Sequence, residues 1–147
     1  MKSERIIESL NKLTPDQKPL WGKMTAQHMV EHLIWTVQCS NGRLKLDCYT
    51  TPERLPILKR FLMSNKPLPQ LFVNPAIGPD LLPLKYSNLE EAKRELEREI
   101  EYYNKYFNEN PEALTVNPIF GKLNKKEWNI LHEKHFALHL SQFGISD

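Results

Sequence analysis

The sequence predicts an all-α domain, a four-helix bundle with a long proline-rich connection in the middle of the chain. Apolar residues recur every three or four positions in several long segments, which is the period of an amphipathic helix. No segment of four or more residues alternates cleanly between apolar and polar side chains, as a half-buried strand does. Five of the eleven prolines fall between Pro67 and Pro83, where neither a helix nor a central strand can continue. The length fits one domain, covering residues 1–147.

The first two predicted helices lie before the proline-rich segment. Residues 3–13 carry apolar side chains at helical spacing and end at a Thr-Pro pair. Residues 25–41 form the second helix, because Thr25 is a typical N-cap and Asn41-Gly42 is a typical C-terminal stop. The apolar residues of this second segment are spread over nearly the whole circumference of the helix, so we expect it to lie at the centre of the fold.

The middle of the chain is predicted to be mainly irregular. A short helix is expected over residues 52–64, with Pro52 in its first turn. Residues 66–86 follow with five of the prolines and no helical period. A long irregular segment inside a compact domain commonly carries or covers a functional site, so we expect residues 66–86 to lie over a pocket.

Two long helices complete the predicted bundle. The third begins with a reciprocal capping box between Ser87 and Glu90 and continues with one apolar stripe. The fourth begins at Asn124, with Glu127 three residues later, and ends before Gly144. Helices joined by long central connections are typical of a bundle.

Composition and charge exclude several classes of protein. Lys and Arg number 20 and Asp and Glu 18, and the two signs are interleaved, so no basic face for nucleic acid is expected. The charged N-terminal segment lacks the apolar core of a signal peptide, and no apolar run reaches the ~20 residues that span a bilayer. We therefore expect a cytoplasmic protein without membrane or nucleic-acid partners, in which Cys39 and Cys48 are reduced thiols.

All five histidines fall on the second and fourth long helices. At about 100° per residue, His132, His135 and His139 lie within roughly 60° of one another, which predicts that all three face inward. His28 and His32 are four residues apart and share one face of the second helix. Histidines are therefore concentrated on two helices that a bundle can bring together.

This pattern predicts a divalent metal site. His135 and His139 have the i, i+4 spacing that lets two imidazoles reach one ion, and His32 on a facing helix is a suitable third ligand. Three imidazoles leave coordination positions open, as in catalytic zinc sites. The spacing leaves two alternatives: core histidines that hydrogen-bond to neighbours, or a structural ion whose fourth ligand is His28, Cys39 or a group in the proline-rich segment.

Two quoted stretches carry a resemblance to a known family. "MTAQHMVEHLIWT" together with "LHEKHFALHLSQFG" resembles the DinB/YfiT-like superfamily of metal-dependent four-helix bundles, and "NPIFGKLNKKEWNILHEKHFALHLSQFG" is similar to a bacterial subfamily of unassigned function. The resemblance places the family's metal ligands on His32, His135 and His139. It leaves His28 and His132 as candidates for the shell around the ligands, where they orient a ligand or take up a proton.

The resemblance also implies a class of reaction. Members of the superfamily include metal-dependent transferases that use low-molecular-weight thiols such as bacillithiol or mycothiol, an isomerase of that type, and hydrolases. A small-molecule transferase or hydrolase is therefore expected, with zinc as the first choice of metal and nickel as the second. Glu31 and His132 are the nearest candidates for a general base, and the resemblance also implies a homodimer. The alternative is a non-catalytic bundle that binds a partner or small ligand, or holds a purely structural metal.

Overall fold

The fold is mostly helical in the computed structural model, which describes residues 1–70 and 72–146. The elements in those residues are α1 (Ser3–Leu10), α2 (Ala26–Ser40), α3 (Leu55–Met63), α4 (Leu89–Glu109), β1 (Thr115–Asn117), β2 (Gly121–Leu123) and α5 (Lys125–Gln142). The predicted helical fold is confirmed at this level. Its finer assignment to a four-helix bundle of the DinB/YfiT-like type stays a prediction.

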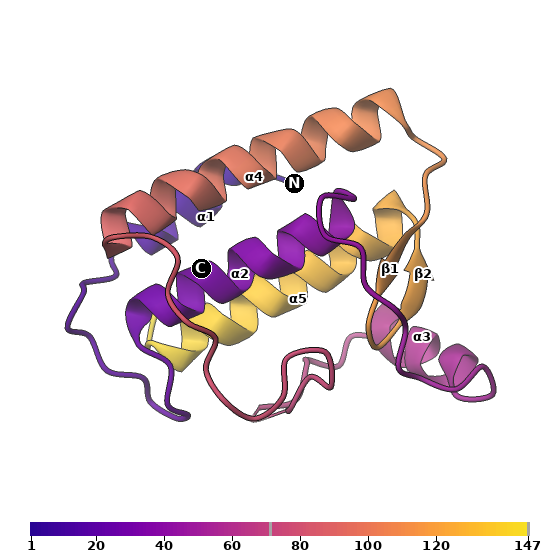
Figure 1. Cartoon of the computed structure of the whole chain (residues 1–147), viewed down its shortest axis with the longest axis horizontal. Helices are drawn as coiled ribbons and strands as arrows, with labels where there is room; N and C mark the ends of the chain where they lie inside the picture. The colour runs from indigo at the N-terminus through magenta and orange to yellow at the C-terminus, as the bar shows by residue number, and fades with distance from the viewer. Residues whose placement is uncertain (71, 147) are drawn as a thin grey trace.

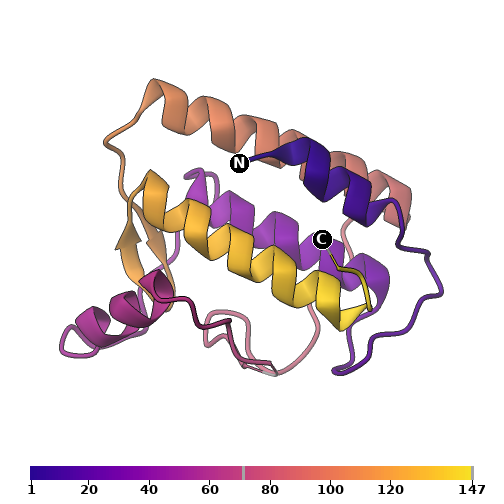
Figure 2. The same ribbon diagram turned by 180° about the vertical axis from the view of Figure 1, so that it is seen from behind.

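Helix α2 lies at the centre of the helical layers, as its sequence predicts. It packs against α4 on one side and against α5 on the other, and α5 runs antiparallel to it (Figure 1). Helix α1 lies behind α4 in that view and in front of it from the opposite side, in contact with both α4 and α5 (Figure 2). Within the described residues, no helix has the length and apolar character needed to cross a membrane.

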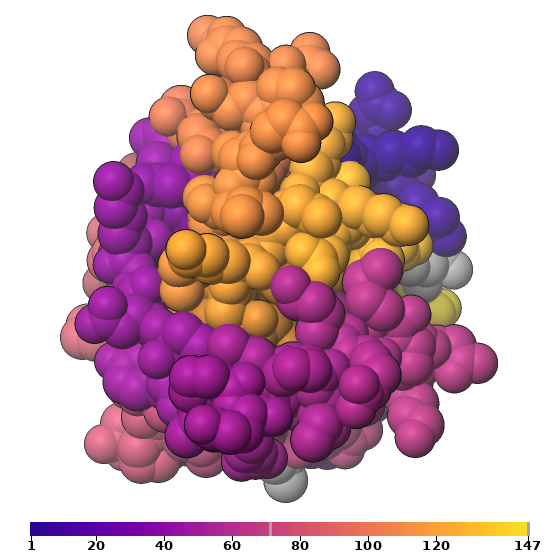
Figure 3. Space-filling model, turned by 90° about the vertical axis from the view of Figure 1, so that its right-hand side faces the viewer, coloured from indigo at the N-terminus to yellow at the C-terminus, as the bar shows by residue number. Residues whose placement is uncertain are grey.

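One end of the molecule is covered by α3, the β1–β2 hairpin and the chain that leaves α2, which meet there (Figure 3). Hydrogen bonds join these segments: the amide of Tyr49 donates to the carbonyl of Pro118 at 2.8 Å, and the hydroxyl of Thr50 donates to the carbonyl of Ile119 at 2.7 Å. The connection after α2 is therefore held against the hairpin, which in turn places α3 beside α5.

The caps of the two helices that carry histidines form as predicted. The Thr25 hydroxyl accepts a hydrogen bond from the amide of His28 at 3.1 Å and so caps α2. At α5 the Asn124 side chain accepts from the amide of Glu127, and the Glu127 carboxylate accepts from the amide of Asn124, which completes a capping box. These caps fix where each histidine-bearing helix starts and hence the register of its side chains.

Two helix starts differ from the prediction. The N-cap of α4 is Asn88 and not Ser87, because the Asn88 side chain accepts from the amide of Glu91 at 2.8 Å while the Ser87 hydroxyl donates to the Glu91 carboxylate. Helix α3 begins at Leu55, so Pro52 lies in the preceding turn and Pro56 takes the first-turn position.

The prediction of a purely α-helical chain is corrected by the hairpin. Strands β1 and β2 pair antiparallel, with Asn117 opposite Gly121. The Asn117 side chain accepts from the amides of Ile119 and Phe120 at 2.8 and 2.9 Å, which closes the turn, and Gly121 has a φ of 74° that a side chain would strain. Strands of three residues are too short for alternation to be visible in the sequence, although Asn117-Pro118 is itself a turn signal.

Candidate metal centre

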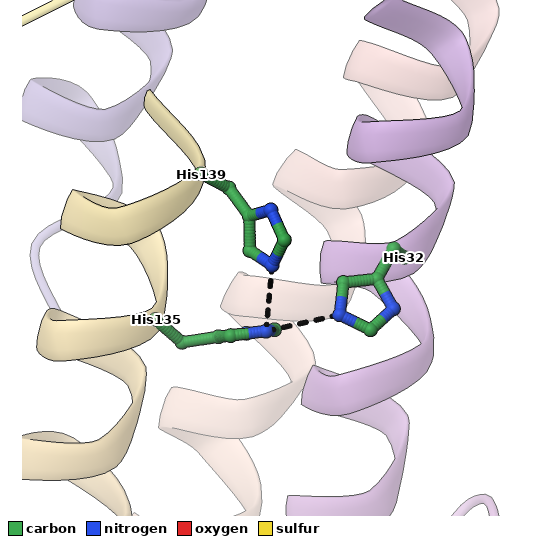
Figure 4. A group of neighbouring side chains, drawn as sticks. All are labelled: His32, His135 and His139. Atoms are coloured by element: carbon green, nitrogen blue, oxygen red, sulfur yellow. Dashed lines mark hydrogen bonds between the residues drawn. The ribbon is translucent and has the colours of Figure 1, made fainter. Parts of the chain in front are cut away.

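Three histidines from two helices converge at one point. His32 comes from the middle of α2, and His135 and His139 come from successive turns of α5 (Figure 4). The Nε2 atom of His135 lies 3.0 Å from Nε2 of His32 and 3.1 Å from Nε2 of His139. The structure thus brings together the three predicted ligands, although His32 and His135 are 103 positions apart in the sequence.

The spacing of these nitrogens suits one ion. Zinc–imidazole bonds of about 2.0–2.1 Å keep two nitrogens on the same ion within about 4.2 Å of each other. The two Nε2 separations at His135 already meet that limit, and the ligand atoms of all three histidines lie within 4.8 Å of one another. A shift of about half an ångström in the remaining pair therefore brings all three into range.

Burial favours the neutral form that a metal ligand needs. Burial, followed by the neighbouring His139, lowers the pKa of His32 to about 3. Burial and the neighbouring histidines hold the pKa of His135 well below its usual value. Burial also lowers the pKa of His139, while its hydrogen bond to Gln142 acts in the opposite direction. At neutral pH all three rings are uncharged, and each has one nitrogen lone pair to offer.

Gln142 fixes the orientation of the His139 ring. Its Oε1 atom lies 2.9 Å from Nδ1 of His139, and its Nε2 donates to the carbonyl of Trp21 at 3.1 Å. Because the carbonyl of Trp21 can only accept, the amide nitrogen faces Trp21 and the amide oxygen faces His139. Nδ1 of His139 therefore carries the proton, and its Nε2 presents a lone pair to the other two histidines.

The remaining candidate residues from the sequence lie elsewhere. Nδ1 of His28 is 2.6 Å from the Thr25 hydroxyl at the start of α2, where the ring also lines the cavity described below. His132 does not share the direction of the other α5 histidines: it points into the core, is 1% exposed, and its Nε2 lies 2.8 Å from the hydroxyl of Ser40. The prediction that the α5 histidines face inward is confirmed for His132 and His139, which are buried, and for His135, which meets His32, but His132 does not join the cluster. The roles proposed for His28 and His132 at a metal centre stay predictions.

The set of ligand groups is open on one side. Among residues 1–70 and 72–146, the His, Cys, Asp and Glu side chains that converge closely enough to share an ion are these three histidines. Cys39 lines the same cavity, and burial raises the pKa of its thiol to about 12, but its sulfur is not among the ligand atoms that converge. The arrangement resembles the three-ligand pattern of a catalytic site more than the four-ligand pattern of a structural one.

The histidines open onto a cavity of about 710 Å³. Its walls come from α2 and α5, from α3, from the loop before α2, and from described residues of the proline-rich segment. The expectation that this segment lies over a pocket is met for those residues. A volume of this size accommodates a small-molecule ligand.

Glu31, next to His32 on α2, ties the end of the proline-rich segment to the cavity wall. Its carboxylate accepts from the amide of Lys85 at 2.7 Å and from the amide of Tyr86 at 3.3 Å. Gln27, one turn earlier, donates to the Glu31 carboxylate at 2.9 Å and to the carbonyl of Tyr86 at 2.7 Å. Both oxygens of Glu31 are thus engaged in holding the chain. Nothing in the sequence pattern pairs Glu31 with Lys85, so this role was not predicted.

Replacing Glu31 is expected to loosen this attachment. Hydrogen bonds to a charged group contribute about 1.5–3 kcal/mol, so Glu31→Ala should increase hydrogen exchange at the amides of Lys85 and Tyr86 by at least about tenfold. Glu133→Ala, an exposed position on α5, is the control and should leave these amides unchanged. Equal exchange in both variants would show that other contacts hold the segment.

Comparison of the chain with protein-family models, curated proteins and solved structures finds no match in any of the three. Membership of the DinB/YfiT-like superfamily therefore stays a prediction. The site must be interpreted from its own geometry.

Proposed function

We propose that the protein is a divalent-metal-dependent enzyme of the DinB/YfiT-like type, which acts on a small molecule with an ion held by His32, His135 and His139. The observation that carries the proposal is the convergence of the three Nε2 atoms on the wall of a 710 Å³ cavity. A purely structural ion would need neither open coordination positions nor an adjoining cavity.

The residues of the chain have separate tasks in this proposal. The three imidazoles would hold the ion. Gln142 keeps the proton of His139 on Nδ1, the ring nitrogen that faces away from the ion. When bound, the ion supplies a nucleophile by lowering the pKa of water toward neutrality or by holding a thiol as thiolate. Imidazole ligands suit zinc and nickel, and zinc is our first choice. Glu31 is engaged with backbone amides and His132 with Ser40, so neither is assigned the role of general base.

The charges around the cavity favour hydrolysis over transfer of an anionic thiol. Among the described lining residues, the cationic side chains are Lys23 and Lys85, and both residues are exposed. Lys23 also lies 3.9 Å from the carboxylate of Asp80. Recognition of an anionic thiol cofactor would call for cations inside the cavity. Thiol transfer is therefore the second candidate.

A metal-dependence assay tests the proposal. Hydrolysis of neutral aryl esters is measured with zinc-loaded protein, with metal-free protein and with His32→Ala, and thiol transfer to a small electrophile is measured in parallel. We expect turnover that requires the ion. In His32→Ala the rate should fall to the background that histidine side chains support without an ion, whereas Glu133→Ala should retain the full rate. Bound zinc without turnover in either assay would contradict the enzyme and favour a structural ion.

Gln142 is expected to control metal affinity without touching the ion. Hydrogen-bond partners of metal-bound histidines typically change metal affinity by 10–100-fold, so Gln142→Ala should weaken zinc binding by about that factor. Ser141→Ala, at the exposed neighbouring position, should bind zinc as the unmodified protein does. Competition with a chromophoric chelator measures both. Equal affinities in the two variants would mean that the Gln142 contact does not orient His139.

A further inference from the structure

The cavity beside the histidines is lined mainly by apolar side chains. Helix α3 supplies Leu58 and Phe61, and the proline-rich segment supplies residues that include Phe72, Leu82 and Leu84. Three of these side chains remain open to water: Phe72 is 58% exposed, Leu82 43% and Leu84 45%. Large apolar side chains that line a pocket and stay open to water are typical of a ligand-binding surface.

Polar groups are unevenly distributed over the same cavity. The histidines lie on the α2 and α5 wall, while Leu58 and Phe61 come from α3 on another wall. The lining lysines, Lys23 and Lys85, are exposed, and Lys23 is near Asp80. Other polar residues, such as Gln38 and Asn117, also line the cavity, but the histidines are the group that converges on one point. A ligand inside the cavity therefore meets the histidine cluster on one wall and an apolar surface on another.

We infer that the substrate is an amphipathic small molecule: one polar, metal-binding group lies at the histidines and an extended apolar portion lies against α3 and the residues around Leu82. This inference rests on the proposed function for the position of the polar group. The apolar portion depends only on the shape and lining of the cavity. Burying each additional methylene there contributes about 0.8 kcal/mol, which is about a fourfold gain in affinity.

A series of straight-chain alkyl hydroxamic acids, with two to ten carbons, tests the inference. The hydroxamate group is a metal-binding probe, and the alkyl chain probes the cavity. Dissociation constants are measured by calorimetry with zinc-loaded protein and with the His135→Ala, His139→Ala double variant. We expect affinity for the zinc-loaded protein to rise about three- to fourfold per methylene until the chain fills the cavity.

The two parts of the proposal fail in different ways. If acetohydroxamic acid binds the zinc-loaded protein but chain length has no effect, the apolar substrate is ruled out while the metal site stands. If every compound binds the double variant as tightly as it binds the zinc-loaded protein while affinity still rises with chain length, the apolar cavity is supported and the position of the polar group at an ion is overturned.

Matched substitutions locate the apolar portion. Leu58 lies on the cavity wall, and Ile57 lies beside it on α3 but outside the cavity. Each is replaced by Asp in a separate variant. Leu58→Asp should weaken binding of the ten-carbon compound by at least tenfold and leave acetohydroxamic acid unaffected, whereas Ile57→Asp should change neither. If Leu58→Asp does not fold, Leu82→Asp and Met63→Asp form a second pair, 43% and 41% exposed, of which only Leu82 lines the cavity. Equal binding by both members of a folded pair would overturn the assignment.

Discussion

The double variant His135→Ala, His139→Ala should lose more than about 100-fold in zinc affinity. That loss exceeds the effect typical of removing one outer hydrogen-bond partner, because two of the three proposed ligands are removed and His32 alone remains. A ligand that binds only the folded state at 1,000 times its dissociation constant stabilises that state by about 4 kcal/mol. Zinc should therefore raise the melting temperature of the unmodified protein and leave that of the double variant unchanged.

Elemental mass spectrometry after dialysis against zinc, combined with thermal unfolding, measures both effects. Glu133→Ala on the same helix should retain near-stoichiometric zinc, which separates loss of ligands from a general effect of substitution in α5. Far-ultraviolet circular dichroism checks that the double variant is folded. Equal, negligible zinc in all three proteins would exclude the metal centre and leave a binding or structural role for the helices.

A second large effect is expected from His132 at acid pH. This ring is buried between α5 and α4, with its plane stacked on Trp128 at 5.3 Å and its edge against Tyr103 at 5.1 Å between ring centroids. The hydroxyl of Ser40 donates to the carbonyl of Val37 at 2.6 Å and therefore accepts from Nε2 of His132. The Nε2–H group of the neutral ring thus has a hydrogen-bond acceptor. Protonating the ring would place a positive charge in an apolar core.

The sign of the pH dependence follows from this burial. Burial, with a smaller contribution from the positive N-terminus, lowers the pKa of His132 from 6.5 to about 3. Between these values the unfolded chain binds a proton that the folded protein does not, so the contribution is fully present above pH 6.5 and is lost as the pH falls toward 3. The complete loss is about 5 kcal/mol, which is comparable to the whole stability of a small domain.

Urea unfolding at pH 7 and pH 4.5 measures this dependence. His132→Phe, which keeps an aromatic ring in the core, should lose about 2–3 kcal/mol less stability between the two pH values than the unmodified protein. Ser40→Ala should keep the full pH dependence, because it removes the hydrogen bond but leaves the ring buried. If His132→Phe and the unmodified protein respond equally to acid, His132 is not the group that becomes protonated on unfolding.

Local signals in the sequence predicted the helices well because their causes are local. The side chains of Thr25 and Asn124 cap the helices that they precede, and the i, i+4 spacing of His135 and His139 places both rings on one face. The third predicted ligand, His32, also reaches the cluster. These residues were identifiable because helix geometry sets the direction of each side chain from its position in the chain.

Other features depend on packing that no local pattern specifies. His132 lies within the same 60° sector as its neighbours on α5, yet Ser40, Trp128 and Tyr103 draw it into the core. The hairpin consists of strands too short for a periodic signal. The cavity is assembled from segments distant in sequence, so its apolar lining and the attachment of Lys85 to Glu31 could be seen only in three dimensions.

The meeting of His32 with His135 across 103 residues of sequence also has a mechanical consequence. An ion shared by these two side chains would make the chain between them a closed loop, much as a reversible cross-link does in a polymer. Fully extended, such a loop has a contour of about 340–370 Å, at 3.3–3.6 Å per residue. When the protein is pulled from its two ends, this loop would not extend until the cross-link ruptured. The ion would therefore protect most of the chain from extension under force.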